Sequence, residues 1–343
     1  MRPTFMAAVF AMAAALPVCA SANGEVNLYS YRQGFLIEPI LAEFTKQTGI
    51  NVNLVFAKKG IVEKIKAAGA NNPADAVLTV DIGRLDALAQ AGLLQPVTSP
   101  ALNIIPSAYR HEDGLWYGLT TRARVVYAHK DRVPEGAINN VADLADAKWR
   151  GKLCTRSGKH VYNVGLIASV IAHHGEAEAE QWLRGVKANL ARKPQGNDRA
   201  QAKGIYEGVC DIAIANHYYM GKMATNEKKP EQQEWAKVIR VTFLDQDGVG
   251  QHVNLSGAGV IKGAKNKDNA VRLIEFLASP EAQHMYATNN FEYPVRPGIK
   301  TDPYIESFGS FKADSLPLSA IAKHRKEASK LVDKLKFNEG ADG

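Results

Sequence analysis

The sequence predicts an α/β protein with two lobes, each built on a mixed or mostly parallel sheet flanked by helices, and two segments that cross between the lobes. Strand-like stretches, in which apolar and polar residues alternate, recur between amphipathic helix-like stretches. This alternation is typical of β-α-β units and of a mostly parallel sheet. The chain has 343 residues, which is more than one hydrophobic core normally holds, so two lobes are expected.

The first 22 residues predict a secretory signal peptide. Arg2 precedes an uncharged apolar run over residues 5–18, and residues 20–22 form an A-x-A cleavage site. The mature chain is then expected to begin near Asn23 and to lie in the periplasm. No later stretch approaches the roughly 18 consecutive apolar residues of a membrane-spanning helix.

The amino-terminal part predicts three strands and three helices in alternation. In the first helix, Ile37, Ile40, Leu41 and Phe44 share one face, and Gly49 is a stop signal. The strands are marked by alternating apolar residues. The expected order is a strand at 25–31, a helix at 36–49, a strand at 50–57, a helix at 61–70, a strand at 75–81 and a helix at 82–94.

Two β-rich runs around Arg122 and Arg124, in GLWYGLTTRARVVYAHKDRV, interrupt the alternation of strands and helices and mark the first expected crossing between the lobes. The second is expected near residue 245, which makes both lobes discontinuous. The amino-terminal lobe is expected over 23–121 and 246–296, and the carboxy-terminal lobe over 122–245 and 297–343. Helix and strand alternation resumes over 140–149, 162–190 and 199–216, followed by strands at 238–244 and 252–263, a helix at 266–287 and a Lys-rich, solvated helix at 316–335.

The formal net charge of +7 becomes +6 when Arg2 leaves with the signal peptide (7 − 1). A positive balance suits an anionic ligand, an acidic membrane surface or nucleic acid. The basic residues are spread along the chain, and no RNP-like, helix-turn-helix or zinc-finger pattern occurs, so nucleic acid is not an expected partner. No GxSxG, P-loop or HExxH motif occurs either, so nothing supplies the nucleophile and base of an enzyme.

Cys154 and Cys210 are expected to form a disulfide. The sequence has three cysteines, and Cys19 leaves with the signal peptide, so an even pair remains in an oxidising compartment. In the chain-entropy model this long loop closure contributes roughly 4 kcal/mol. Redox and zinc interpretations are disfavoured, because neither a CxxC motif nor the ligand spacing of a structural zinc site is present.

Three tyrosines follow predicted strands. Tyr162, in KHVYNVG, follows the strand after Cys154, and Tyr218 and Tyr219, in IANHYYMGK, follow the strand that bears Cys210. Ligands bind at the carboxyl ends of strands in open parallel sheets, and the disulfide would bring these two ends together. A phenol has a pKa near 10, so it ionises at neutral pH only beside a large positive charge such as a bound cation. Phenolate is a hard oxygen donor, and three phenolates neutralise a trivalent ion, which points to ferric iron.

Arg32, Arg122 and Arg124 are the candidates for holding an anion beside the metal. Arg32 ends the first strand in YSYRQ, and the other two lie in TTRAR at the first crossing. A guanidinium group offers a planar fork to carbonate or a carboxylate. The plainer alternative is that these arginines form ordinary salt bridges between the lobes. The tyrosines would then be amphipathic residues at the edge of the core.

These stretches resemble the periplasmic ferric-iron-binding proteins that serve ABC importers. The resemblance runs in order over nearly all of the expected mature chain, and the pair YN and NHYYMG is its most specific part. The other stretches are NLYSYRQGFLIEPILAEFTKQTGI, GLTTRARVVYAHKD, WRGKLCTRSGKHVYNVGLIAS, PQGNDRAQ, GVCDIAIANHYYMGK and GAGVIKGAKNKDNAVRLIEFLASPEAQ.

The resemblance implies a bilobal, type II periplasmic-binding-protein fold that closes over its ligand. It implies Tyr162, Tyr218 and Tyr219 as the Fe(III) ligands, with Arg32 and an arginine of TTRAR near a synergistic anion such as carbonate. It also implies an inner-membrane ABC permease as the partner and a monomeric protein.

One departure from the family pattern concerns the first strand. Several relatives place a His-Tyr pair shortly after it, where this chain has Gln33 and Gly34. The chain therefore resembles the branch that uses three tyrosines with a small anion, and a contribution from Tyr31 or Gln33 is left open. Two other hypotheses remain: a binding protein for a small oxyanion or carboxylate that uses the arginines alone, and an exported enzyme with a phenol-assisted or arginine-assisted site.

Overall fold

The structure is a computed structural model that describes residues 24–341, so the expected signal peptide lies outside the described residues. Within that range, no helix is long and apolar enough to cross a membrane.

The amino-terminal part alternates strands and helices as expected. Its elements are β1 (Gly24–Ser30), α1 (Gly34–Thr48), β2 (Ile50–Phe56), α2 (Ile61–Ala68), β3 (Ala76–Thr79), α3 (Ile82–Gln90) and β4 (Leu94–Gln95). β1 lies between β2 and β3 and is parallel to both. The four predicted apolar residues of α1 are buried, and Gly49 ends this helix with a φ of 71°, a left-handed conformation that glycine adopts readily.

Two long strands, β5 (Tyr117–His129) and β9 (Val253–Ile261), connect the two halves of the molecule. The two β-rich runs expected around Arg122 and Arg124 are one strand of 13 residues, all of them buried. Its residues 117–123 pair with β9, and its residues 124–128 pair with β7 (Ile212–Asn216). The two expected sheets are therefore continuous through β5, in the order β2-β1-β3-β9-β5-β7-β6.

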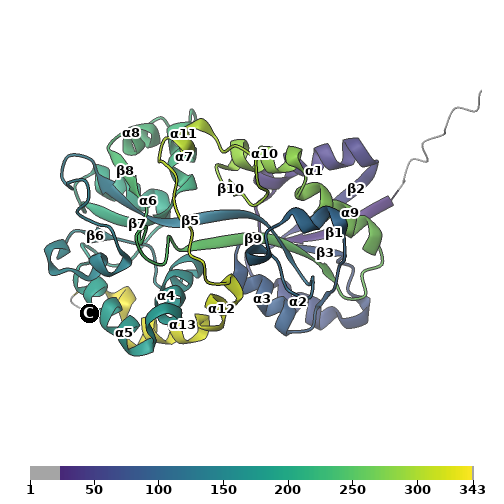
Figure 1. The fold of residues 1–343 in the computed structure, drawn as a ribbon, viewed down its shortest axis with the longest axis horizontal. Coiled ribbons are helices and arrows are strands. Elements are labelled where there is room, and N and C mark those ends of the chain that lie inside the picture. The colour runs from purple at the N-terminus through teal and green to yellow at the C-terminus, as the bar shows by residue number, and fades with distance from the viewer. Residues whose placement is uncertain (1–23, 342–343) are drawn as a thin grey trace, which may run out of the picture.

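The carboxy-terminal half contains β6 (Leu153–Cys154), α4 (Val161–His174), α5 (Glu176–Ala188), α6 (Asp198–Tyr206), β7, α7 (Tyr218–Ala224), α8 (Glu231–Lys237) and β8 (Ile239–Thr242). The single helix expected at 162–190 is two helices, because Gly175 between them has a φ of 84°, which no right-handed helix contains. β6 and β7 are parallel neighbours, so α4 and α7, which follow them, begin at the same edge of the sheet. Figure 1 shows β5 and β9 running between this half, on the left, and the purple and blue elements on the right.

The last part of the chain contains α9 (Lys267–Leu277), α10 (Pro280–Asn290), β10 (Tyr293–Pro294), α11 (Pro303–Glu306), α12 (Leu318–Lys323) and α13 (Arg325–Lys334). The helix expected at 266–287 is divided, because the side chain of Ser279 caps a new helix that begins at Pro280.

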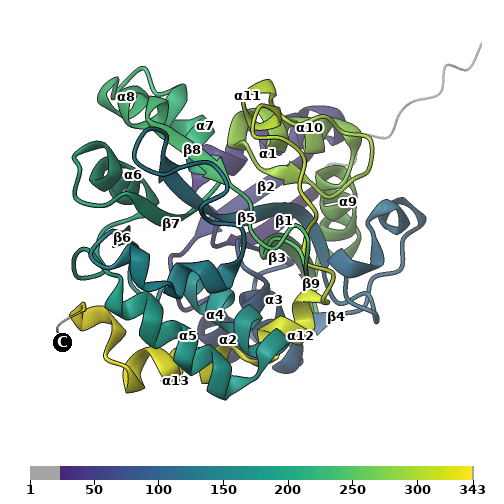
Figure 2. The same cartoon turned by 60° about the vertical axis from the view of Figure 1, so that its left-hand side comes forward.

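The single solvated helix expected at 316–335 is divided into α12 and α13, and its lysines are exposed as expected, but it also has a buried face. Its two helices bury Leu318, Ile321 and Leu331, and both pack against α4 (Figure 2). α12 also contacts α3, so the carboxy-terminal segment touches both halves of the molecule. The crossings expected near residues 122 and 245 fall inside β5 and between β8 and β9. The lobe boundaries drawn at these crossings stay a prediction.

Candidate binding cleft

A cleft of about 460 Å³ lies between the two halves of the molecule. Its walls combine residues that follow β1, β2 and β3 with residues near the starts of α4, α6 and α7. Open α/β sheets bind their ligands at this edge, and the volume suits a small ligand. Among the described residues that line it, seven are arginine or lysine and one, Glu292, is acidic, so the cleft favours an anionic ligand or a metal that is accompanied by anions.

The three predicted phenols meet in this cleft. The hydroxyl oxygens of Tyr162 and Tyr218 are 3.4 Å apart, and the ring centroids of Tyr218 and Tyr219 are 4.3 Å apart. Tyr162 is the second residue of α4, and the other two are the first residues of α7. The parallel pairing of β6 and β7 places these two helix starts side by side. Adjacent residues of a helix diverge by only about 100°, so both phenols of α7 can face the same cleft.

The phenols of α7 are protonated in the ligand-free protein. Burial, together with the neighbouring phenols of Tyr162 and Tyr219, raises the pKa of Tyr218 well above 10. Burial and the nearby Tyr162 also raise the pKa of Tyr219. A cation bound between them would reverse this preference, because a nearby positive charge stabilises the phenolate.

Other metal-binding side chains do not gather in the described part of the chain. Within residues 24–341, no three side chains of His, Cys, Asp or Glu lie together so that they could hold a metal. His160, beside the phenols, caps α4 by accepting a hydrogen bond from the N–H of Tyr162 at 3.3 Å. A cation that enters the cleft therefore meets phenol oxygens as its main donors.

Arg32 and Arg122 line the cleft and are joined through Glu292. Arg32 donates to both carboxylate oxygens of Glu292, at 2.8 and 3.1 Å, and Nε of Arg122 lies 4.0 Å from the same carboxylate. Both guanidinium groups also donate to the hydroxyl of Ser256. Burial would raise the pKa of Glu292, but the charges of the two arginines and the hydrogen bonds from Arg32 and Thr120 outweigh burial and lower this pKa to about 2. The carboxylate is therefore charged, and the arginine pair keeps one excess positive charge.

Arg124 is not among the residues that line the cleft. Its guanidinium group pairs with the buried carboxylate of Asp198 at 2.7 Å and donates to Asn163 and Asn216. Two residues along a strand advance the chain by about 6.6 Å, which carries Arg124 past the position of Arg122 at the cleft. The structure thus brings Arg32 and Arg122 together and places Arg124 in a buried salt bridge.

Further cations that the sequence pattern did not single out line the cleft. The guanidinium groups of Arg156 and Arg199 lie 5.3 and 5.4 Å from the ring centroids of Tyr162 and Tyr219. Burial lowers the pKa of Lys222 to about 8. Arg156 follows β6, so the strand-end rule that located the phenols could have found it. The remaining unpredicted cations of the cleft are Lys58 and Arg84.

Tyr31 and Gln33 both line the cleft. The hydroxyl of Tyr31 accepts a hydrogen bond from the N–H of Ile61 at 3.2 Å, and the guanidinium group of Arg84 lies 4.0 Å from its ring centroid. Burial raises the pKa of Tyr31. Its oxygen is therefore engaged with the first residue of α2 at the amino-terminal wall of the cleft.

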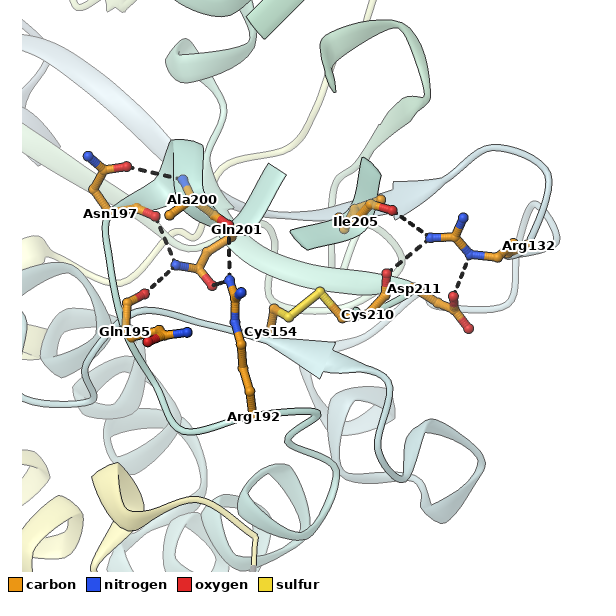
Figure 3. The surroundings of a disulfide bond; sticks show 10 residues. All are labelled: Arg132, Cys154, Arg192, Gln195, Asn197, Ala200, Gln201, Ile205, Cys210 and Asp211. Atoms are coloured by element: carbon orange, nitrogen blue, oxygen red, sulfur yellow. Dashed lines mark hydrogen bonds and ion pairs between the residues drawn. A yellow bond between two sulfur atoms is a disulfide. The ribbon is translucent and has the colours of Figure 1, made fainter. Parts of the chain in front are cut away.

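The expected disulfide is present and joins the end of β6 to the start of β7, the two strands that lead towards the phenols. Cys154, which ends β6, is bonded to Cys210, which precedes β7, with 5.9 Å between their Cα atoms (Figure 3). Arg132 donates to the carbonyl of Cys210 at 3.1 Å and to the carboxylate of Asp211 at 2.6 Å. Because β7 leads into α7, these bonds fix the base of the segment that carries Tyr218.

The chain belongs to the family of bacterial extracellular solute-binding proteins, whose model matches residues 40–313. It is 42% identical over 311 residues to iron uptake protein A1 of Synechocystis sp. (strain ATCC 27184 / PCC 6803 / Kazusa), an alignment that covers 90% of this chain and 86% of that protein.

Solved structures agree with this assignment. The fold matches that of apo ferric ion-binding protein A of Pasteurella haemolytica with a TM-score of 0.87, at 48% identity and covering 92% of this chain and 98% of that one. It also matches the Trichodesmium protein IdiA (FutA) in complex with iron and citrate ligands, with a TM-score of 0.87, 43% identity and coverage of 92% and 100%. The predicted two-lobed, type II binding-protein fold is confirmed. The enzyme hypothesis is set aside because the family and these relatives are binding proteins.

Proposed function

We propose that this protein captures ferric iron in the cleft between its lobes, bound to the phenolates of Tyr162, Tyr218 and Tyr219, and delivers it to an ABC importer. The observation that carries the proposal is the meeting of these phenols, two of them 3.4 Å apart, in a cleft where Glu292 is the one acidic side chain among the described lining residues. Phenolate oxygens are hard, anionic donors that match a small trivalent cation. The names of the relatives, an iron uptake protein and a ferric ion-binding protein, support the same ligand.

A synergistic anion beside the iron belongs to the proposal. Three phenolates balance the charge of Fe(III), so the excess of cationic side chains in the cleft is left for an anion. Arg32 and Arg122 would face it, because a guanidinium fork can hold two oxygens of carbonate or of a carboxylate. Arg124 is held in its salt bridge to Asp198 and does not line the cleft, so in this proposal it does not contact the anion. Carbonate is one candidate anion, and citrate is a second, because the Trichodesmium relative was solved with iron and citrate.

The proposed place of action is the periplasm. The first 22 residues predict a signal peptide, and the family is one of extracellular solute-binding proteins. The proposed partner is the inner-membrane permease of an ABC importer, to which a monomer would deliver iron. One relative, from Sinorhizobium fredii, is named a probable ABC transporter periplasmic-binding protein.

The test is a visible absorption titration of the mature, metal-stripped protein with ferric citrate in bicarbonate buffer. Phenolate-to-iron charge transfer should appear and saturate at one equivalent, and Tyr218→Phe should lose or shift the band. Tyr206→Phe is the matched control, because Tyr206 is 47% exposed at the end of α6. A folded wild-type protein that stays colourless would exclude phenolate ligation.

A small-anion binding protein is the second candidate function, favoured by the seven cationic side chains of the cleft. It would hold a sulfate, phosphonate or carboxylate through Arg32 and Arg122 without iron. Calorimetric titration of the iron-free protein with each anion distinguishes the two functions. This alternative predicts tight binding that Tyr218→Phe scarcely changes, whereas the iron proposal predicts weak anion binding until iron is present.

A further inference from the structure

His217, the residue immediately before the phenol pair, has both ring nitrogens engaged with the backbone. Nδ1 accepts a hydrogen bond from the N–H of Ala123 at 3.1 Å, so the ring proton lies on Nε2, which donates to the carbonyl of Phe291 at 3.0 Å. The ring is fully buried and stacks on Tyr293 with 4.2 Å between centroids. One nitrogen carries a proton and the other accepts a hydrogen bond, so neither has a lone pair to offer a metal. His217 is therefore not an iron ligand, although it directly precedes the proposed ligands Tyr218 and Tyr219.

The two backbone partners of His217 adjoin the arginine pair. Ala123 follows Arg122 on β5, and Phe291 precedes Glu292, whose carboxylate holds both Arg32 and Arg122. His217 thus connects the helix that carries the phenols to the crossing strand and to the segment that carries the counter-charge of the guanidinium groups.

The segment 289–292 contacts α7 at two further places. The carbonyl of Asn289 accepts a hydrogen bond from the ammonium group of Lys222 at 2.9 Å. The ring of Phe291 lies so close to Gly221 that a Cβ at this position would overlap it. Phe291 has a φ of 60°, in the left-handed region that non-glycine residues rarely adopt. The same few residues therefore hold the phenol helix on one side and the arginine pair on the other.

We propose that His217 and Glu292 are positioning residues that fix the separation between the phenol pair and the arginine pair, so that iron and its anion bind as one unit. This inference rests on the proposed iron function. The phenols and the guanidinium groups come from segments far apart in the chain, and a ligand that bridges them gains from both only when their spacing is set in advance. The measurable consequence is the coupling between the anion and iron, which is the ratio of iron affinities with and without the anion.

The experiment measures that ratio. Iron is supplied as ferric nitrilotriacetate to the mature protein under argon, in carbonate-free buffer and again with added bicarbonate, and the charge-transfer band gives the conditional affinity. His217→Phe keeps a ring but loses both hydrogen bonds. His217→Asn keeps an acceptor near the place of Nδ1, and His217→Gln keeps a donor near the place of Nε2. Glu292→Gln removes the carboxylate charge, and His284→Phe, at an exposed position of α10, is the control.

The expected result for His217→Phe is a charge-transfer band like that of the wild type and a ratio reduced by roughly ten- to a hundredfold, the scale of an unmet buried hydrogen bond. The His217→Asn and His217→Gln variants should each restore part of the ratio. Glu292→Gln should reduce it, and the control should not. Unfolding in urea identifies the variants that are folded. If His217→Phe does not fold, His217→Asn and Glu292→Gln keep the test decisive.

Three outcomes would overturn the inference. A His217→Phe protein that loses the band as Tyr218→Phe does would show that His217 is needed for phenolate ligation of iron itself and not only for its coupling to the anion. Folded His217 and Glu292 variants with the wild-type ratio would remove their positioning role, as would a wild-type protein with no coupling between bicarbonate and iron. A colourless wild-type protein would instead refute the proposed function itself, so the two failures are distinguishable.

Discussion

Replacing one phenol of the cleft should remove one proton from the stoichiometry of iron binding. In the free protein, burial and the neighbouring phenols raise the pKa of Tyr218 well above 10, so its hydroxyl keeps its proton at neutral pH. Binding of Fe(III) to the phenolate must expel that proton. Three phenol ligands expel about three protons, and the Tyr218→Phe protein should expel about one fewer.

The proton count sets the pH dependence of the affinity. Each expelled proton makes the affinity for free Fe(III) fall about tenfold for every unit by which the pH drops, because protons compete with iron for the same oxygen. Three protons give a limit of about a thousandfold per unit for the wild type, and two give about a hundredfold for Tyr218→Phe. The dependence extends over the whole range below the pKa of Tyr218, so it should hold throughout the neutral and mildly acidic range.

The assay is calorimetry of ferric nitrilotriacetate binding at neutral pH in two buffers with different ionisation enthalpies. The slope of the observed enthalpy against the ionisation enthalpy is the number of protons released. Protons taken up by the liberated chelator are the same for every protein and cancel in the difference between variants. Tyr206→Phe serves again as the matched control, because it removes an exposed phenol of the same half.

Two results would refute this reasoning. Equal proton release by the wild type and by a folded Tyr218→Phe protein would mean that this phenol keeps its proton when iron binds. An iron affinity that does not change with pH, after correction for the chelator, would exclude phenolate ligation as a whole.

Three further predictions concern the scaffold. Replacing Cys154 and Cys210, which are 56 residues apart, with serine should lower the free energy of unfolding by about 4 kcal/mol, and an unchanged urea midpoint would contradict the loop-entropy estimate. Gly221→Ala should weaken iron binding in the absorption titration, because the added Cβ would overlap the Phe291 ring. This loss is expected even though alanine favours a helix over glycine by about 1 kcal/mol. An unchanged affinity would argue against the close packing of Gly221 and Phe291. Glu292→Gln should cost roughly 3–5 kcal/mol at neutral pH, since it leaves buried guanidinium groups without a counter-charge. The lowered pKa of Glu292 contributes stability that is present above pH 4.5, the ordinary pKa of this group, and is lost as the pH falls towards about 2. The difference in thermal unfolding between wild type and Glu292→Gln should therefore shrink between these two pH values. A constant difference would refute the assignment.

Local sequence patterns were sufficient to predict most of the elements around the cleft. The apolar face of α1 follows from the helical period of its apolar residues, and its end follows from a glycine that adopts a left-handed backbone readily. Both signals lie within about one helix length of sequence. The divisions at Gly175 and at Ser279 were missed although each has a local signal in the sequence: a glycine stop like Gly49, and a serine cap followed by Pro280.

The meeting of the three phenols and the disulfide could both be predicted from the sequence. The carboxyl ends of parallel strands gather at one edge of a sheet, and Cys154 and Cys210 are the two cysteines that remain once the predicted signal peptide is removed. Only the tertiary structure decided which arginines reach the cleft and what holds them. Arg32 and Glu292 are 260 residues apart, and His217 links α7 to segments that no local pattern connects to it. Such pairings depend on how whole strands cross between the lobes, so burial and counter-charge at the cleft become visible only when the chain is folded.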